Sequence, residues 1–151
     1  ARPSDIPQVW GLLSGPMRDA SVVQRSTYYL EQHIGRYRLF CQDEDVLGCC
    51  ELISYPEQQT VEIAALSVAL AYRNQGIGRE LINGVLGEVK RQDILQAIAL
   101  STHEDNVFVS CGFKECSLED LPPEKRFNYD YPQSKIYVYS LMGPGNDINT
   151  D

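Results

Sequence analysis

The feature that most constrains this chain is a junction where a strand-like segment runs into a glycine-containing turn and then into a helix. Residues 60–68 are typical of a strand, and residues 77–89 repeat apolar side chains at helical spacing. The turn between them carries Arg73, Gly76 and Gly78. The first amides of a helix lack intrahelical acceptors, the helix dipole adds positive charge, and glycines let an anion approach the backbone. The junction therefore indicates either a phosphate site or a solvated turn without a ligand.

Two helices and three strands are predicted up to this junction. Ser4 is a suitable N-cap for a helix over residues 5–13, which we expect to end at Gly15 and Pro16. A second helix is predicted over residues 27–34. Three strand-like segments with polar turns between them predict an antiparallel meander over residues 37–41, 46–55 and 60–68.

After the junction the elements alternate. The sequence predicts a helix whose apolar face runs from Ile77 to Val89 and which ends at Asp93. A buried strand over 94–100, a short helix over 106–111 and a last strand over 136–141 follow. This order predicts a mixed sheet with helices on its faces, an α+β or α/β layout. A chain of 151 residues suits one hydrophobic core. We therefore expect one stand-alone domain over residues 1–142 and a tail over residues 143–151.

The charge balance disfavours nucleic acid as a partner. Acidic residues outnumber basic ones by 21 to 13, which gives a net charge of −8, whereas phosphate backbones require a basic face. A negative surface weakly favours cationic substrates such as amines. No apolar run is long enough to span a bilayer, so we expect a cytoplasmic protein with no membrane partner. Homodimerisation through the last strand is compatible with the sequence.

The five cysteines predict neither a disulfide framework nor a metal site. Their number is odd, no Cys-x-x-Cys pair occurs, and His33 and His103 lack metal-site spacing with any cysteine. We expect buried, reduced thiols and no metal. Cys49, Cys50 and Cys111 remain conceivable nucleophiles, but no base lies beside them in a recognisable motif.

The segment Arg73-Asn74-Gln75-Gly76-Ile77-Gly78 resembles the acetyl-CoA pyrophosphate motif of the GNAT acetyltransferase superfamily. Leu66-Ser67-Val68 precedes it and Cys111-Gly112-Phe113 follows it at the usual distances. The resemblance implies a mostly antiparallel sheet flanked by helices, with a β-bulge at residues 66–68. It also implies acetyl-CoA as the cofactor. The implied cofactor-binding residues are Leu66, Ser67, Val68, Arg73, Asn74, Gln75, Gly76, Ile77, Gly78, Arg79, Asn106 and Phe108.

Other segments are similar to the acetyltransferase domain of amino-acid N-acetyltransferases of the N-acetylglutamate synthase type. They are Val23-Gln24-Arg25-Ser26, residues 62–68, residues 121–125 and Ser134-Lys135. The similarity implies a small amino acid, glutamate or another, whose α-amine accepts the acetyl group. The implied substrate-binding residues are Arg25, Ser26, Arg36, Tyr129 and Ser134. An arginine usual before the Ser-Lys pair is absent, which weakens the case for glutamate itself.

Acetyl transfer to an amine needs a neutral amine, an oriented carbonyl and a place for developing negative charge. The resemblance gives the oxyanion role to the amide of Leu66. Glu62 is the leading candidate base because it lies on the same strand amid apolar neighbours, although a strand carboxylate facing solvent or an arginine would look the same. His103 is an alternative proton carrier. Phe108 occupies the position where many GNAT enzymes carry a tyrosine that protonates the leaving thiolate.

Three functions remain open on the sequence. The chain could be an N-acetyltransferase for a small amino acid. It could instead acetylate polyamines, peptides or proteins, which the net charge of −8 favours. It could also be a CoA-binding regulatory module without turnover, as the loss of a tyrosine at Phe108 would permit.

Overall fold

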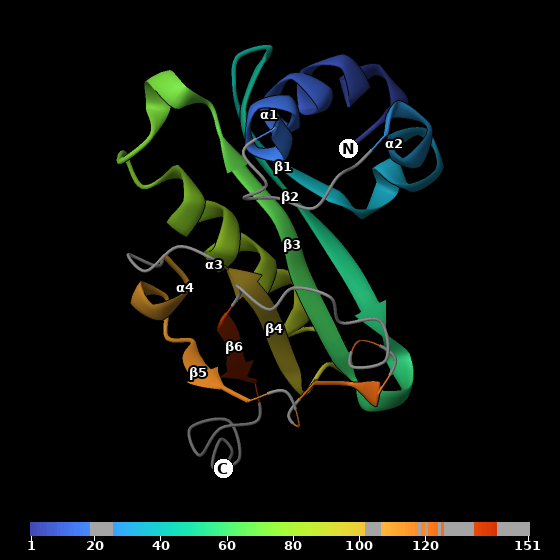
Figure 1. Cartoon of the computed structure of the whole chain (residues 1–151), viewed down its shortest axis with the longest axis vertical. Helices are drawn as coiled ribbons and strands as arrows, with labels where there is room; N and C mark the ends of the chain where they lie inside the picture. The colour runs from blue at the N-terminus through green and yellow to red at the C-terminus, as the bar shows by residue number, and fades with distance from the viewer. Residues whose placement is uncertain are drawn as a thin grey trace.

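The computed structural model describes residues 1–18, 26–101, 107–117, 119, 121–123, 125 and 135–141. Within these residues, the strands form one sheet in the order β1-β2-β3-β4-β6-β5 (Figure 1). Only the β3–β4 pair is parallel among the described strand pairs; the other neighbours are antiparallel. The strands are β1 Tyr37–Gln42, β2 Asp45–Tyr55, β3 Thr60–Val68, β4 Gln96–Ser101, β5 Lys114–Cys116 and β6 Lys135–Ser140. The α-helices are α1 Ile6–Arg18, α2 Thr27–His33, α3 Ile77–Val89 and α4 Val107–Ser110.

The two faces of the sheet carry different helices, and the adjacent residues Cys49 and Cys50 show the division. Successive side chains of a strand point to opposite faces. Cys49 belongs to an apolar cluster with α1 and α2, whereas Cys50 belongs to the cluster with α3. We call these the α1 face and the α3 face. In Figure 1, α1 and α2 lie together at the top, and α3 lies apart from them on the other side of β3.

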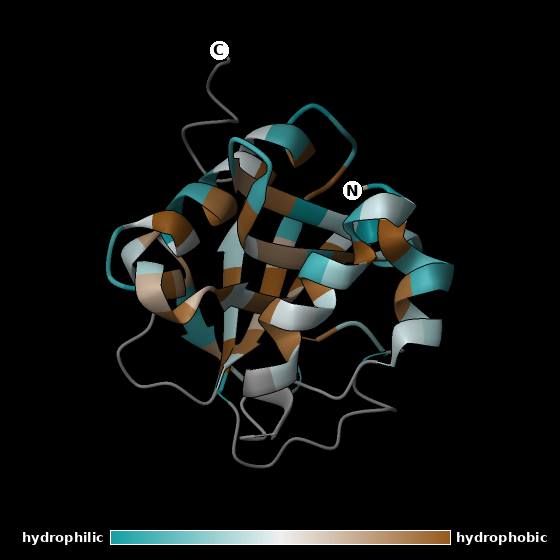
Figure 2. Ribbon diagram, turned by 90° about the horizontal axis from the view of Figure 1, so that it is seen from above, coloured by the Kyte–Doolittle hydropathy of each residue, from teal (hydrophilic) through white to brown (hydrophobic). Residues whose placement is uncertain are grey.

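The α3 face holds the larger part of the core. One side of α3 buries apolar residues at helical spacing, and α4 adds Phe108, which packs edge-on against Phe113 at a centroid distance of 5.2 Å. Figure 2 shows hydrophobic segments gathered between the helices and the strands. The buried residues of α3 are Ile77, Leu81, Ile82, Val85, Leu86 and Val89.

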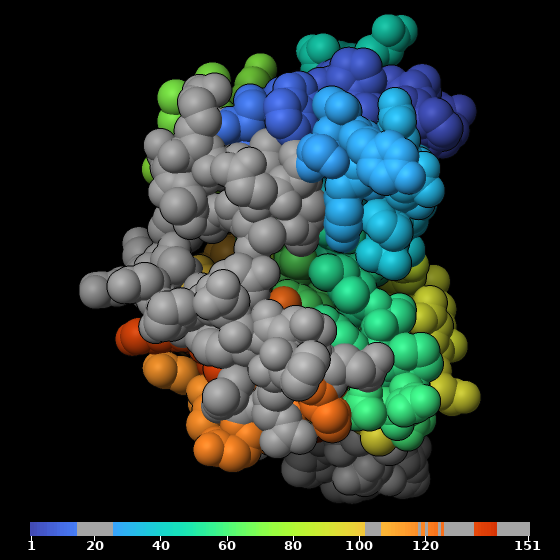
Figure 3. Space-filling view, turned by 45° about the vertical axis from the view of Figure 1, so that its right-hand side comes forward, coloured from blue at the N-terminus to red at the C-terminus, as the bar shows by residue number. Residues whose placement is uncertain are grey.

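The α1 face is covered at two ends by different segments. At one end α1 and α2 pack Val9, Leu13 and Leu30 against Cys49. The side chain of Ser26 accepts a hydrogen bond from the amide of Tyr29 at 2.9 Å and so caps α2. At the other end, Leu121 belongs to a separate cluster with residues of β2, β4 and β6. Figure 3 shows α2 above, residues near 120 below, and the surface of β2 between them.

Most predicted elements are present, with differences at their ends. The predicted stop at Gly15 and Pro16 is wrong, because α1 continues to Arg18. Val9 and Leu13 of α1 are fully buried, so tertiary packing outweighs the local helix-breaking tendency. The three-residue β5 was not predicted. The predicted tail over 143–151 lies outside the described residues. No helix in the described part of the chain is long and apolar enough to cross a lipid bilayer.

Candidate functional site

The two parallel strands of the sheet separate after a short pairing. β3 and β4 are paired only through Thr60–Glu62 and Gln96–Ile98 in the described structure. Beyond this point β3 continues with β2 as its partner, while β4 continues with β6. Within the described residues, the edge of β3 from Ile63 to Val68 therefore has no strand partner on the β4 side, and we call this divergence of the two strands the opening. In Figure 1, β3 runs well past the end of β4.

A β-bulge lies on β3 at this opening. Cys49 pairs with Ser67 and Glu51 pairs with Ala64, so Ala65 and Leu66 together oppose Cys50. Ala65 has a φ of 54°, which is left-handed backbone that a non-glycine residue adopts only under local constraint. The predicted bulge is therefore present but begins one residue earlier than the expected residues 66–68. It redirects the backbone groups around Leu66, the predicted oxyanion donor.

The glycine turn that follows β3 is open to a ligand. Gly76 is the N-cap of α3 with a φ of 85° and has no side-chain cap, and a Cβ added to it would meet nothing within 4 Å. The amide of Glu80 donates the first helical hydrogen bond to Gly76, at 3.0 Å. The amides of residues 77–79 therefore have no acceptor within the helix. A Cβ on Gly78 would lie 3.8 Å from Val107 and 3.9 Å from Leu66, so this glycine faces the opening.

Two further groups fit a bound phosphate-bearing molecule at the opening. Arg73 folds back so that its Nε donates to the carbonyl of Val68 at 3.3 Å, while Arg79 is exposed. The Oγ of Ser67 is buried and has no hydrogen-bond partner within the described structure. A buried hydroxyl without a partner is costly unless a ligand or water satisfies it. The residues present therefore fit the expected acetyl-CoA site.

Glu62 is buried, not solvent-facing. Its side chain is 4% exposed, Tyr55 donates to its Oε1 at 3.0 Å, and Lys125 Nζ lies 3.1 Å from its Oε2. A carboxylate this deep requires such partners to remain charged. Glu62 is three residues before Ala65, which places it about 10 Å from the bulge along the strand. The sequence left open that Glu62 faces solvent or an arginine. The structure shows neither, because its cationic partner is Lys125.

A second buried carboxylate, Glu51, was missed by the sequence analysis. It is fully buried, accepts hydrogen bonds from the hydroxyls of Tyr29 and Tyr37 (the latter at 3.3 Å), and lies 3.5 Å from Nη1 of Arg36. Glu51 pairs with Ala64, two residues from Glu62. The two carboxylates are thus diagonal neighbours on the α1 face, with Cα atoms about 7–8 Å apart. The alternation of β2 and β3 was the signal that could have paired them.

The structure brings only some of the remaining predicted residues close to the site. Arg36 lies over the α1 face against Glu51, and Ser26 serves as a helix cap. The ring of Phe108 is buried on the α3 face, so it contributes packing. Asn74 has a φ of 64° in the turn, beside Gln75. The predicted residues that lie outside the described part of the chain are Arg25, His103, Asn106, Tyr129 and Ser134.

Comparison with known proteins agrees with this geometry. Residues 7–113 match the family model described as acetyltransferase (GNAT) family. The chain belongs to the GNAT family. An amino-acid acetyltransferase from Vibrio atlanticus (strain LGP32) is 31% identical over 142 residues, which cover 93% of this chain and 32% of that protein.

Solved GNAT structures are similar over the same span. N-acetylglutamate synthase from Neisseria gonorrhoeae, complexed with coenzyme A and N-acetyl-glutamate, superposes with a TM-score of 0.85 at 29% identity, over 91% of this chain and 33% of that one. The same enzyme with coenzyme A and L-arginine gives a TM-score of 0.81 at 30% identity, over 95% and 32%. This GNAT chain therefore spans about a third of the length of these relatives.

Three cysteines of this GNAT chain, Cys49, Cys50 and Cys111, are poor nucleophiles. Burial raises the pKa of Cys49, and burial also raises the pKa of Cys50 to about 12. Partial burial raises the pKa of Cys111. The thiolate, not the thiol, attacks carbonyl carbon, and these thiols stay protonated at neutral pH. These three thiols are therefore not activated nucleophiles.

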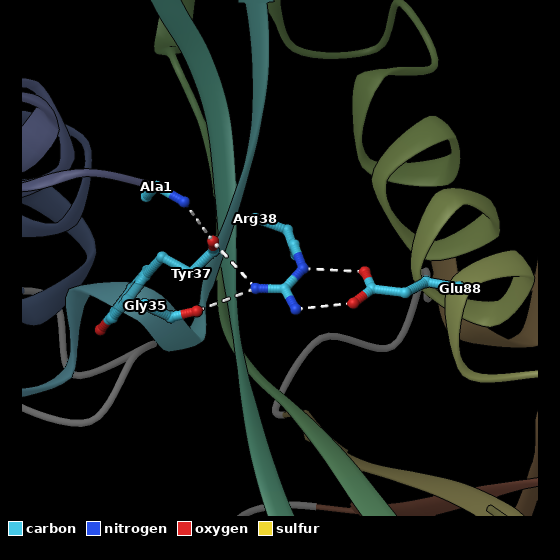
Figure 4. A network of polar contacts seen from close by, with 5 residues as sticks. All are labelled: Ala1, Gly35, Tyr37, Arg38 and Glu88. Carbon is cyan, nitrogen blue, oxygen red and sulfur yellow. Dashed lines mark hydrogen bonds and ion pairs between the residues drawn. The ribbon is translucent and has the colours of Figure 1, made fainter. Parts of the chain in front are cut away.

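A second arginine–glutamate pair lies on the α3 face of the GNAT fold. Arg38 donates to both carboxylate oxygens of Glu88, at 2.8 and 2.7 Å, and also to the carbonyls of Gly35 and Tyr37 (Figure 4). These bonds raise the pKa of Arg38 and lower the pKa of Glu88. The pair ties β1 to α3 on the face of the sheet opposite to Arg36–Glu51, and so it serves as a structural reference for that pair.

Proposed function

We propose that this protein is an acetyl-CoA-dependent N-acetyltransferase that acetylates the α-amine of a small amino acid. One observation carries the proposal: β3 and β4 diverge beside a bulge, with the open glycine turn of α3 at the end of the same strand. This arrangement offers a slot for an extended arm, a backbone donor for a carbonyl and amides for a diphosphate. Membership of the GNAT family supports it.

The glycine turn and the edge of β3 hold acetyl-CoA, the acetyl donor. The amides of residues 77–79, with Arg73 and Arg79, bind the diphosphate, and Asn74 and Gln75 lie beside it. Gly76 and Gly78 keep the approach free of side chains. Residues 66–68 line the slot with backbone groups, and the partnerless hydroxyl of Ser67 is available to the ligand within the described structure.

Glu62 and the Leu66 amide carry the chemistry. Acetyl-CoA supplies the acetyl group as a thioester, whose carbon–sulfur bond breaks as the amine nitrogen bonds to the carbonyl carbon. The amide of Leu66 donates to the carbonyl oxygen, a contribution of about 2.7–4 kcal/mol for such a donor. Glu62 accepts the proton that the amine loses, directly or through water, while Tyr55 and Lys125 hold the carboxylate in place. His103 is the alternative acceptor, and the thiolate leaves without help from Phe108.

The α1 face supplies the acceptor site. Arg36 and Ser26, with Arg25, Tyr129 and Ser134, form the set that holds the amino acid. An α-amine loses its proton more readily than a lysine side chain, because reference pKa values are about 7.7–8.0 and 10.4. The similarity to amino-acid acetyltransferases supports this acceptor class.

A second candidate is an acetyltransferase for polyamines or peptides. The net charge of −8 favours a cationic acceptor. A third, a CoA-binding module without turnover, rests on Phe108, which is a buried phenyl ring.

Release of CoA thiol, followed with a thiol reagent, tests these functions. The acceptor panel contains amino acids, polyamines and short peptides, each at several concentrations with acetyl-CoA. Release with amino acids alone supports the proposal, and release with spermidine or peptides supports the second candidate. CoA binding by calorimetry without release for any acceptor would overturn the proposed activity in favour of the third.

A further inference from the structure

The Arg36–Glu51 pair lies beside the proposed reaction centre. Glu51 is opposite Ala64, the residue immediately before the bulge, and its side chain is on the α1 face. Arg36 reaches across from the end of α2 to place its Nη1 3.5 Å from Glu51 Oε2. The guanidinium therefore lies over the face from which we propose that the acceptor approaches.

The two members of the pair differ in access. The side chain of Glu51 is fully buried and is fixed by the hydroxyls of Tyr29 and Tyr37. The side chain of Arg36 is 44% exposed. A guanidinium has five N–H donors, and the contact recorded with Glu51 uses only one nitrogen. Glu51 cannot touch an acceptor without leaving its site, whereas Arg36 can.

The charges on this face are compatible with an anionic ligand at Arg36, because each buried carboxylate has a cationic partner. Glu51 and Glu62 are buried diagonal neighbours, and Glu62 already has Lys125 as its partner. A carboxylate-bearing acceptor placed here without a further cation would be repelled by both. Arg36 neutralises Glu51 and still offers donors in a planar fork that matches a carboxylate.

We propose that Glu51 is a positioning residue that holds Arg36 over the α1 face, where Arg36 binds a carboxylate of the acceptor close to the reacting amine. The inference rests on the proposed function and deepens it. Because Glu51 is one residue from the bulge, the bound carboxylate is close to the amine, as in an amino acid. A polyamine or an internal peptide lysine carries no carboxylate there.

The test compares an amino acid with its amides. The acceptor is the best amino acid of the panel, measured beside its α-amide and, for an acidic amino acid, its side-chain amide. Turnover gives kcat and KM, and calorimetry with CoA present gives Kd without requiring turnover. Arg36→Gln should raise KM and Kd for the amino acid about 10- to 100-fold, the range for a lost charge-assisted bond. Arg36→Gln should leave kcat for the amino acid within about 2-fold of the wild-type value. It should also leave KM and Kd within about 2-fold for the amide that lacks the bound carboxylate.

Glu51→Gln and a matched control separate positioning from folding. Glu51→Gln should reduce the preference for the amino acid over its amide, measured as the ratio of their Kd values, by about 3- to 10-fold. KM for acetyl-CoA should be unchanged. Arg36→Lys should restore part of the preference. Glu88→Gln removes the carboxylate of the other arginine pair and should leave the ratio unchanged. Arg36→Gln alters a half-exposed side chain, so it tests the idea even if Glu51→Gln does not fold.

Four outcomes would overturn the inference. The wild type could bind acid and amide equally, Arg36→Gln could weaken both equally, or Glu88→Gln could change the ratio as much as Glu51→Gln does. CoA release with polyamines alone would also overturn it while leaving an acetyltransferase. Absence of any release would overturn the proposed function instead, and a preserved acid preference in Kd would then keep Arg36 as a carboxylate site.

Discussion

The two faces of the sheet differ in what they bury. Within the described residues, the buried polar or charged side chains are Glu51, Thr60, Glu62 and Ser67, and the register of β2 and β3 places all four on the α1 face. The α3 face buries apolar side chains, from Val61 and Ile63 to α3. Desolvated polar groups cost free energy, so a fold retains them chiefly where they have a task. The difference teaches that one face is apolar core, whereas the other combines apolar packing with the buried carboxylates to which we assign the chemistry.

Glu62→Gln is the sharpest test of the chemical role of the α1 face. The amide keeps the shape but cannot accept the proton, so kcat should fall about 10²–10⁴-fold while KM for acetyl-CoA stays within a few-fold. Initial rates and KM measured across pH 6–9 check this. Equal rates for both proteins over that range would remove Glu62 from the mechanism, and a thermal melt guards against loss of fold because Lys125 loses its partner.

Gly78→Asp tests the cofactor site at the end of the α3 face. A carboxylate at the helix start should repel the diphosphate and raise Kd for acetyl-CoA by about 100-fold, equivalent to ~2.7 kcal/mol. The fold should persist, because the nearest atoms to an added Cβ are 3.8 and 3.9 Å away. Gly76→Asp should act similarly, with added strain from its φ of 85°.

Gly84→Asp is the matched control for this charge. Gly84 is on the same helix, and an added Cβ there meets nothing within 4 Å. Calorimetric titration with acetyl-CoA should give nearly wild-type affinity for Gly84→Asp. Wild-type affinity in Gly76→Asp and Gly78→Asp as well would contradict the phosphate assignment.

Gly48→Ala tests whether packing on the α3 face positions the turn. An added Cβ would lie 2.9 Å from Ile77 Cγ2 and 3.0 Å from Leu81 Cδ1, so these side chains or α3 itself must shift. Overpacking of this kind should lower the free energy of unfolding by about 1–3 kcal/mol. Because Ile77 begins α3, affinity for acetyl-CoA should also fall. Urea unfolding and calorimetry measure the two effects.

Gly84→Ala, a substitution in α3, should change the free energy of unfolding in the opposite direction. With open space around its Cβ, alanine should raise the free energy of unfolding by about 0.4–1 kcal/mol. A stabilised Gly48→Ala, or one with unchanged stability and unchanged affinity, would show that β2 does not set the start of α3.

Glu88→Gln should have the smallest effect. Its bidentate bond to Arg38 is partly exposed, and such pairs contribute about 0.2–1 kcal/mol. Because the fold lowers the pKa of Glu88, its contribution is present above the unfolded value and is lost as pH falls through the folded value. The stability gap between wild type and variant should therefore narrow from pH 7 towards pH 3, with kcat unchanged at pH 7. A gap that widens on acidification would contradict this sign.

Local pattern was enough for much of the fold. The pattern of residues 60–68 predicted β3 with its observed bounds, and the helical spacing from Ile77 predicted α3, which ends at Val89 rather than at the predicted Asp93. The same pattern placed the glycine turn between them. The helix stop at Gly15 and Pro16 was wrong and β5 was missed, because burial of α1 against the sheet and the pairing of β5 with β6 depend on distant partners.

The sequence by itself determined which residue types stand at the turn and which face of each strand or helix is apolar, since these depend on spacing along the chain. Only the tertiary structure decided that β3 leaves β4 after Glu62, that the bulge begins at Ala65, and that Glu51 lies beside Glu62. It also decided that Lys125 pairs with Glu62 and Arg36 with Glu51. Strand register and burial bring together residues far apart in the chain, and a buried charge takes its partners from whatever the fold places next to it.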